Sequence, residues 1–166
     1  MILATGSPEG RPSARVVLLK EICEQGLVFY TNYCSRKAIE MERNPFVSVA
    51  IFWEPLGYQV RIEGRVEKVS ARKSDLYFSS RPRGSQLSAW ASAQSSEIPS
   101  RAHLEHEISR LEKIYNGKPV PRPPWWGGYL LVPDHFEFWK EGKNRLHDRV
   151  MYEIAGKNWT RKLLAP

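Results

Sequence analysis

The chain has few cysteines and no long apolar run, and both absences exclude classes of protein. Cys23 and Cys34 are the only cysteines among 166 residues, and they form no metal-ligand pattern with the four histidines. Two cysteines are also too few for a disulfide framework. No apolar stretch approaches the ~20 residues that cross a membrane, and residues 1–4 are too short for a signal-peptide core. We therefore expect free thiols, a reducing compartment and a cytoplasmic protein.

The sequence also lacks internal repeats, low-complexity segments and a long basic tail. Its length fits one domain over residues 1–166, with a substantial core. The formal net charge is +7 and the isoelectric point is about 9.5, which suggests nucleic acid, acidic membrane or a phosphorylated small molecule as partner. Because the cations occur in short separate groups, the pattern disfavours a simple nucleic-acid arm.

Short apolar runs between turn residues predict a mainly β-protein with some helices. We expect strands over residues 14–22, 27–31, 46–53, 58–69, 128–132, 136–140, 148–154 and 159–163. Helices are expected over residues 35–43, 70–79, 85–93 and 100–115. Strict alternation in residues 58–69 indicates a half-buried strand that bends at Gly64. Strands and helices do not alternate regularly, so we predict an antiparallel β-barrel with peripheral α-helices.

A cationic motif lies near the C-terminus. Arg145, His147 and Arg149 alternate at strand spacing, so an extended backbone would point all three side chains the same way. One sheet face cannot bury two arginines and a histidine without anionic partners. These side chains therefore either lie in open solvent or bind something negative.

Two further clusters have the composition of phosphate sites. Ser35, Arg36 and Lys37 occupy the start of a predicted helix, where cations are unfavourable unless an anion shares the helix N-terminus. Residues 77–85 supply a phenol, hydroxyls and the guanidiniums of Arg81 and Arg83, which suit a phosphate dianion. A solvated first turn and a plain polar loop are the respective alternatives. A third cluster, residues 15–20, is either an ordinary strand or places cations at a barrel rim.

The chain shows no carboxylate pair, metal cluster or nucleophile with an adjacent base. Two phosphate sites and abundant aromatic residues instead suggest phosphorylated heteroaromatic ligands. A cofactor that performs the difficult chemistry would explain why the chain lacks such groups.

Many segments, in order over essentially the whole chain, resemble the pyridoxamine 5′-phosphate oxidase family. They are residues 15–20, 29–32, 35–37, 59–64, 80–83, 85–86, 94–95, 126–129, 137–139, 144–149 and 164–166. The resemblance implies an FMN-binding split barrel that forms a homodimer with FMN at the subunit interface. It also implies oxidation of pyridoxamine or pyridoxine 5′-phosphate to pyridoxal 5′-phosphate, with O2 as acceptor and H2O2 released, and neither nucleic acid nor membrane as partner.

The resemblance further assigns roles by position. The implied FMN contacts are Arg15, Val16, Val17, Leu18, Leu19, Lys20, Tyr30, Thr31, Arg36, Lys37, Gln59, Gln94, Ser95, Trp139 and Arg149. The implied substrate contacts are Lys20, Tyr77, Arg81, Ser85, Arg145, Leu146 and His147. Arg145 and His147 are the catalytic candidates: Arg145 would orient the substrate, and His147 would bind a ring substituent or help to move a proton.

Three residues depart from the family pattern. Tyr58 replaces a usual Arg, Ser88 a usual Gly and Lys140 a usual Gln. The chain also begins later than family members usually do, so either more chain precedes residue 1 or the substrate site is more open. Two rival hypotheses remain at this point: a non-catalytic split barrel that binds FMN or pyridoxal phosphate, and a basic nucleic-acid-binding barrel.

Overall fold

The computed structural model of the chain describes residues 1–156 and 158–166. Contacts between Cα atoms divide it into two compact units. The sheet unit comprises Met1–Phe29, Glu40–Glu67 and Leu130–Pro166, and the helical unit comprises Tyr30–Ile39 and Lys68–Tyr129. The prediction of a single domain stays a prediction. No helix in the described part of the chain is long and apolar enough to span a membrane.

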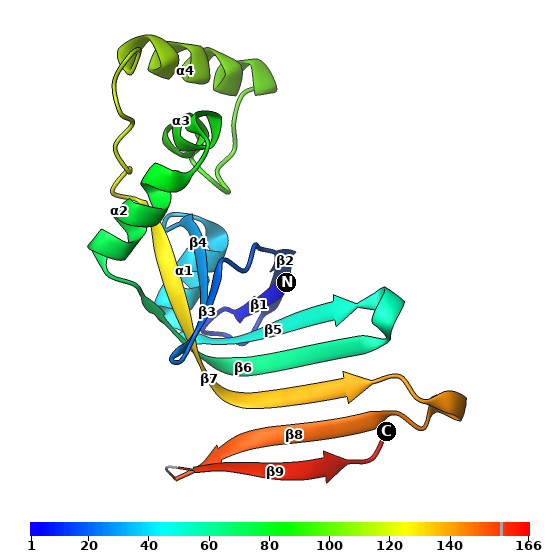
Figure 1. The fold of residues 1–166 in the computed structure, drawn as a ribbon. Coiled ribbons are helices and arrows are strands. Elements are labelled where there is room, and N and C mark those ends of the chain that lie inside the picture. Colours follow the sequence, from blue (N-terminus) through cyan, green and yellow to red (C-terminus); the bar gives the residue numbers. More distant parts are fainter. Residues whose placement is uncertain (157) are drawn as a thin grey trace. The chain divides into compact units, whose positions relative to one another are not determined.

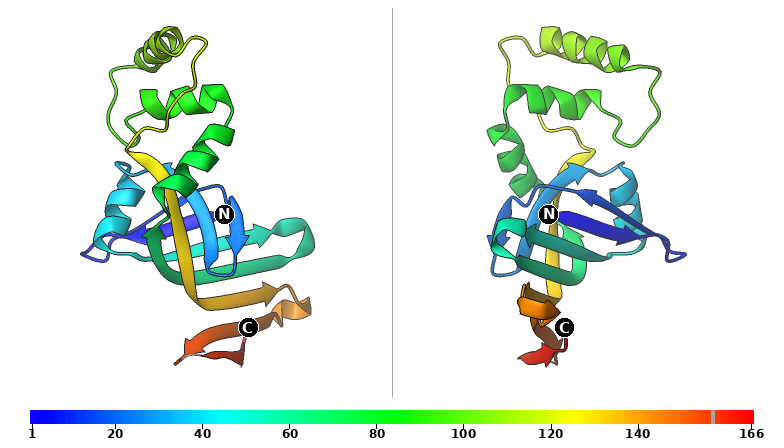
Figure 2. Two further views of the ribbon diagram at one scale, coloured as in Figure 1. Left: turned by 60° about the vertical axis from the view of Figure 1, so that its left-hand side comes forward. Right: turned by 90° about the vertical axis from the view of Figure 1, so that its right-hand side faces the viewer.

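Antiparallel strands make up most of the regular secondary structure (Figure 1). The strands are β1 (Ile2–Gly6), β2 (Pro12–Val16), β3 (Glu21–Cys23), β4 (Gly26–Asn32), β5 (Phe46–Trp53), β6 (Tyr58–Lys68), β7 (Trp126–Lys140), β8 (Asp148–Ala155) and β9 (Asn158–Leu164). Their order is β2-β1-β5-β6-β7-β4-β3, and β8 pairs with both β7 and β9. In both views of Figure 2, β8 and β9 form a hairpin beside the C-terminal part of β7.

Four α-helices and two short 3-10 turns complete the fold. They are α1 (Arg36–Arg43), α2 (Ala71–Ser80), α3 (Arg83–Ala91), α4 (Arg101–Ile114), η1 (Glu54–Leu56) and η2 (Lys143–Arg145). Ser70 and Ser100 cap α2 and α4, since each hydroxyl accepts a hydrogen bond from the backbone N–H three residues later. The four predicted helices are thus confirmed, with bounds that differ by one or two residues.

The core of the sheet unit follows from the period-two pattern of its strands. In β6, Ile62 and Val66 are buried whereas Arg65 and Glu67 are exposed, so the predicted half-buried strand is confirmed. Gly64 is required for space: a Cβ there would lie 2.1 Å from the Val132 carbonyl oxygen. The β6 backbone can therefore approach β7 closely at this point.

Three strand predictions are wrong in their bounds. The predicted strand over residues 14–22 ends at Val16 and resumes at Glu21, because β2 pairs with β1 while β3 pairs with β4 at the other end of the strand order. Conversely, the segments predicted over residues 128–132 and 136–140 are both part of β7, which continues through Pro133. An extended backbone accommodates the fixed φ of proline.

The helical unit has its own core. Phe78 of α2, Leu87 of α3, Leu111 of α4, Val120 and Trp126 form a buried cluster. The Gln86 amide is buried beside it and donates to the backbone oxygens of Phe78 and Ser79. These contacts fix the α2–α3 corner, where residues 77–85 were predicted to bind phosphate.

Candidate functional site

A buried ammonium group lies at the start of α1. Lys37 is 9% exposed, and its Nζ donates to Thr31 Oγ1 at 3.1 Å, Ser35 Oγ at 3.1 Å and Gln94 Oε1 at 3.2 Å. Strand β4 supplies Thr31, the first turn of the helix supplies the lysine, and the loop after α3 supplies the glutamine. The structure therefore brings together three residues that the resemblance assigns to FMN.

The loop after α3 reaches the same helix start through its backbone. The Arg36 backbone N–H donates to Ser95 Oγ at 3.2 Å, and Ser95 has a left-handed φ of 74°. The Asn32 side chain holds this loop, since its amide donates to the Ser92 carbonyl at 3.3 Å. The first turn of α1 contains no acidic residue. Helix N–H groups, hydroxyls and two cationic side chains form the donor set that phosphate groups prefer.

Arg81 provides the strongest sign of an anionic ligand in the helical unit. Its guanidinium lies over the Trp126 ring, 4.6 Å from the centroid. The Nη1 atom is buried and has no hydrogen-bond partner among the described residues. Burial lowers the pKa of this guanidinium, and Tyr77 opposes that shift, although arginine stays protonated in proteins. A buried cationic donor that lacks a protein acceptor suits an anionic group from outside the chain.

The Trp126 ring that lies under Arg81 belongs to a stack of aromatic rings. Tyr30 stacks on Tyr77 with 3.9 Å between ring centroids, and on Trp126 with 5.5 Å. Ser85 lies in the first turn of α3, where its backbone N–H donates to the Pro82 carbonyl. Tyr77, Arg81 and Ser85, the predicted substrate residues of the helical unit, thus all belong to the α2–α3 corner.

In the sheet unit, one face of β6, β7 and β8 carries three predicted flavin residues. Trp139 pairs with Arg149 across the β7–β8 ladder, and Glu137, two residues before Trp139, lies on the same face. Glu137 accepts from Arg149 Nε at 2.8 Å and from Arg61 Nη1 at 3.1 Å. Gln59 is two residues from Arg61 and therefore shares its side of β6.

The electrostatics of this face depend on Glu137. The carboxylate is only 4% exposed. The hydrogen bond from Arg149 is the main cause that lowers the pKa of Glu137, and the charge of Arg61 acts in the same direction. The same bond raises the pKa of Arg149. Sequence reasoning missed Glu137 and Arg61, although their positions two residues from Trp139 and Gln59 were available as a signal.

The prediction that Arg145, His147 and Arg149 share one extended strand is wrong. Asn144 and Arg145 have left-handed φ values of 56° and 63°, and η2 precedes β8, which starts only at Asp148. Left-handed residues interrupt the two-residue alternation that the prediction required. Arg149 therefore lies on the sheet, whereas Arg145 lies on a turn.

The turn nevertheless places His147 beside a predicted flavin residue. The Gly142 backbone N–H donates to His147 Nδ1 at 3.2 Å, and the imidazole centroid is 4.6 Å from that of Trp139. Because Nδ1 accepts a hydrogen bond, the neutral imidazole carries its proton on Nε2. His147 is therefore held in a defined tautomer, while Arg145 and Leu146 are exposed.

Residues 15–20 leave the sheet in the middle of the segment. Arg15 Nη2 pairs with Glu40 Oε2 at 3.3 Å, and its Nη1 donates to Thr5 Oγ1 at 2.6 Å. Residues 17–20 have no regular secondary structure, although the backbone N–H groups of Val17 and Lys20 donate to the Met1 and Val28 carbonyls. Contacts within the chain thus fix both ends of residues 15–20, the segment that the resemblance assigns to FMN.

Two of the three departures from the family pattern are neighbours. Lys140 Nζ lies 5.6 Å from the centroid of the Tyr58 ring, a cation–π contact. The third departure, Ser88, donates its hydroxyl to the Gly84 carbonyl inside α3. None of the three replaces a residue assigned to chemistry.

Comparison with known proteins identifies the family. The family model for pyridoxamine 5′-phosphate oxidase matches residues 1–115. The model for the pyridoxine 5′-phosphate oxidase C-terminal dimerisation region matches residues 126–166. Together these two matches cover most of the chain.

Individual relatives belong to the same family as the two matching models. Pyridoxine/pyridoxamine 5′-phosphate oxidases from Rubrobacter xylanophilus and Myxococcus xanthus are 53% and 49% identical over 100% of this chain, which spans 76% and 81% of their lengths. A crystal structure of PhzG from Burkholderia lata in complex with tetrahydrophenazine-1-carboxylic acid has a TM-score of 0.94 and 32% identity, over 99% of this chain and 81% of that one.

A more distant neighbour supports the fold alone. The pyridoxamine 5′-phosphate oxidase-related, FMN binding protein from Nostoc punctiforme has a TM-score of 0.79 at 19% identity, covering 99% of this chain and 87% of that one. The predicted antiparallel split barrel with peripheral helices is confirmed. On the strength of these matches, this chain belongs to the pyridoxamine 5′-phosphate oxidase family of oxidoreductases.

Proposed function

We propose that the chain oxidises pyridoxamine 5′-phosphate or pyridoxine 5′-phosphate to pyridoxal 5′-phosphate. With the amine, substrate, O2 and water give pyridoxal 5′-phosphate, ammonia and H2O2; with the alcohol, no water is consumed and no ammonia is released. The observation that carries the proposal is the buried Nη1 of Arg81, which has no acceptor in the described chain and suits a substrate phosphate. The names of relatives at about half identity support it.

The residues present fit FMN as the cofactor. The start of α1 offers hydroxyls, backbone N–H groups and the cations of Arg36 and Lys37 to a phosphate. The sheet face with Gln59, Trp139 and Arg149 offers an amide, an aromatic plane and a guanidinium to a heteroaromatic ring. When bound, FMN would supply the two-electron redox chemistry that no side chain of the protein can perform.

The remaining roles belong to the chain's own side chains. Lys20, Tyr77, Arg81 and Ser85 would bind the substrate phosphate, and Arg145 with Leu146 would orient the pyridine ring. His147 would bind a ring substituent or help to move a proton at its Nε2, because its Nδ1 already accepts a hydrogen bond from the Gly142 backbone N–H.

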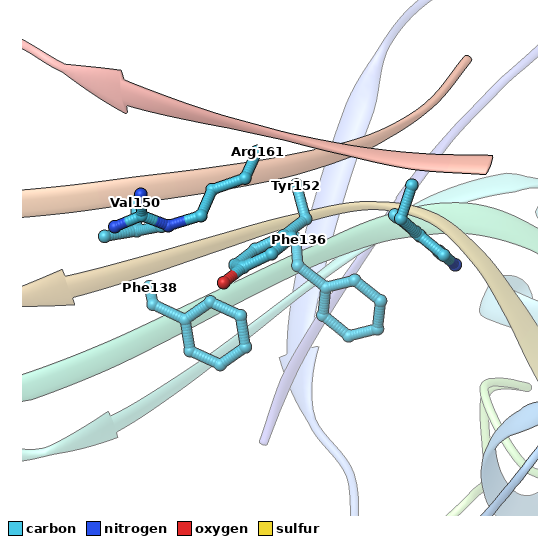
Figure 3. Close-up of a pocket in the computed structure, with 6 residues that line it drawn as sticks. Phe136, Phe138, Val150, Tyr152 and Arg161 are labelled. Atoms are coloured by element: carbon cyan, nitrogen blue, oxygen red, sulfur yellow. The ribbon is translucent and has the colours of Figure 1, made fainter.

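The C-terminal strands support a homodimer. Residues 126–166 match a dimerisation region, and the face of β7–β9 opposite Glu137 carries a groove of about 550 Å³. The groove is lined by Phe136, Phe138, Val150, Tyr152, Trp159 and Arg161 (Figure 3). Phe138 and Trp159 are each 45% exposed. An apolar patch of this kind marks an interaction surface, and we assign it to the second copy of the chain.

Phe138→Asp is expected to shift the protein from dimer to monomer at micromolar concentration. The new carboxylate would have to be buried against aromatic rings without a partner, which is strongly unfavourable. Sedimentation equilibrium measures the result. Leu76→Asp is the control, because Leu76 is an exposed apolar residue, at 64%, outside the dimerisation region of residues 126–166. A Phe138→Asp variant that remains a dimer would contradict this assignment.

The proposed activity is tested with purified full-length chain incubated with FMN. We expect a yellow protein with absorption bands near ~375 and ~450 nm, as oxidised flavin gives, and H2O2 production with either phosphorylated substrate. Unphosphorylated pyridoxamine is the matched control and is expected to react far more slowly. Tetrahydrophenazine-1-carboxylic acid, found with the Burkholderia lata relative, tests a carboxylate substrate that lacks phosphate. A yellow protein that forms no peroxide would support a non-catalytic flavin carrier instead.

A further inference from the structure

We propose that Glu137 is a positioning residue that holds the Arg149 guanidinium in place for FMN. The inference rests on the proposed FMN binding and concerns a residue to which neither the sequence pattern nor the family resemblance gave a role. Glu137 itself is nearly inaccessible, so it is suited to act on another side chain and not on a ligand.

The first support is the way in which Glu137 divides its two oxygens. Oε1 accepts from Arg149 Nε at 2.8 Å, and Oε2 accepts from Arg61 Nη1 at 3.1 Å. The side chain of Glu137 is 5% exposed, that of Arg149 27% and that of Arg61 41%. The buried Glu137 carboxylate therefore anchors two guanidiniums that extend toward solvent. A buried carboxylate is strongly destabilising if it loses its partners, so Glu137 requires these two pairs.

The second support is that Arg149 has N–H donors beyond those bound by other residues of the described chain. Its Nε is used by Glu137, and its Nη1 donates to the Ala165 carbonyl at 2.8 Å. No acceptor for Nη2 occurs in residues 1–156 or 158–166. The guanidinium is therefore fixed on two sides, and the remaining Nη2 donors are available to a ligand on the face that also carries Gln59 and Trp139.

The third support is the charge balance. Glu137, Arg149 and Arg61 together carry one net positive charge, and the partly exposed Glu63 beside Arg61 offsets it from the solvent side. Arg61 also pairs with Glu63 at 3.0 Å, but Glu63 is 42% exposed and contacts Arg61, not Arg149. Glu137 is thus the carboxylate that orients Arg149, while Arg61 compensates the negative charge of Glu137 on this face.

The test is the dissociation constant of FMN, measured by quenching of flavin fluorescence when apoprotein is titrated with FMN. Glu137→Gln is expected to raise this constant about 10- to 100-fold, the range for loss of a charge-assisted hydrogen bond. Glu63→Gln is the matched control, since it removes a carboxylate from the same Arg61 and leaves Arg149 untouched; we expect a change of less than about twofold.

A double-mutant cycle separates positioning from general structural damage. In an Arg149→Gln background, Glu137→Gln should add less than about twofold to the FMN dissociation constant, because its effect acts through the arginine. Independent effects that multiply in the double variant would overturn the proposal. An unchanged dissociation constant in the Glu137→Gln single variant would overturn it as well.

Two further measurements keep the outcome unambiguous. If wild-type chain binds no FMN, the proposed function fails; if it binds FMN and the Glu137 variant binds equally well, only the positioning role fails. Should Glu137→Gln not fold, Glu137→Asp keeps the charge but withdraws the carboxylate from Arg149. For Glu137→Asp we expect the same increase in the FMN dissociation constant and the same non-additivity with Arg149→Gln. A Glu137→Asp variant that binds FMN with wild-type affinity would count against the proposal.

Discussion

Replacement of Arg81 by methionine is expected to lower kcat/KM for pyridoxamine 5′-phosphate by about 100- to 1,000-fold. The guanidinium lies over Trp126 with a buried Nη1 that no described residue accepts from, so a substrate phosphate would be its natural partner. Charge-assisted hydrogen bonds contribute about 1.5–3 kcal/mol each, and an arginine can give a phosphate two of them. The guanidinium carbon lies over the Trp126 and Phe78 rings, and methionine keeps an unbranched apolar side chain whose thioether can contact the same rings.

Steady-state peroxide formation measures this effect, and most of it is expected in KM. Arg72→Met is the control, because Arg72 is an exposed arginine on the same helix. The Arg81 variant should also lose its preference for phosphorylated over unphosphorylated pyridoxamine, which a purely structural defect would leave intact. A variant that keeps both its kcat/KM and its preference would show that Arg81 does not bind the phosphate.

Gly142→Ala is expected to lower kcat/KM by about 100-fold while FMN stays bound. A Cβ at this position would lie 1.8 Å from the Leu146 carbonyl oxygen and 3.3 Å from His147 Cα. Because the first contact is far inside van der Waals distance, the turn that carries Arg145 and His147 must move. Misplacement of a catalytic group by about 1 Å can cost about 100-fold in rate.

The Gly142 variant is compared with Gly84→Ala, where a Cβ would meet nothing within 4 Å. That control removes a helix glycine and should be neutral or slightly stabilising. Kinetics with both substrates, together with the flavin spectrum, separate the two outcomes. Wild-type kcat/KM in Gly142→Ala would show that the turn geometry does not matter to the reaction.

Local pattern was enough for much of the fold. The alternation in residues 58–69 predicted β6, and the polar residues Ser70 and Ser100 marked the starts of α2 and α4. Prediction from local pattern failed where contacts between residues far apart in the sequence determine the backbone conformation. Nothing local shows that residues 17–20 connect strands at opposite ends of the strand order, or that Arg145 adopts a left-handed φ.

The candidate site shows the same division. Lys37, Gln94 and Ser95 could be named from the resemblance, and the structure gathers them at the start of α1. Glu137 was missed, because its two-residue spacing from Trp139 indicates only a shared face, whereas its partner Arg61 is 76 residues away and the contact depends on the register between β6 and β7. A carboxylate between two aromatic residues looks like an ordinary strand position until its neighbours across the sheet are known.

The two faces of β7 and β8 have a consequence for insertions and deletions. Phe136 and Phe138 line the apolar groove, whereas Glu137 and Trp139 lie on the opposite face. Removal of one residue from either strand would exchange the faces, so that aromatic rings would replace the charged network and the reverse. The lengths of β7 and β8 are therefore constrained both by the apolar groove on one face and by the charged network on the other. If the two faces have the proposed roles, point substitutions would alter assembly and FMN affinity separately, whereas a change in strand length would alter both.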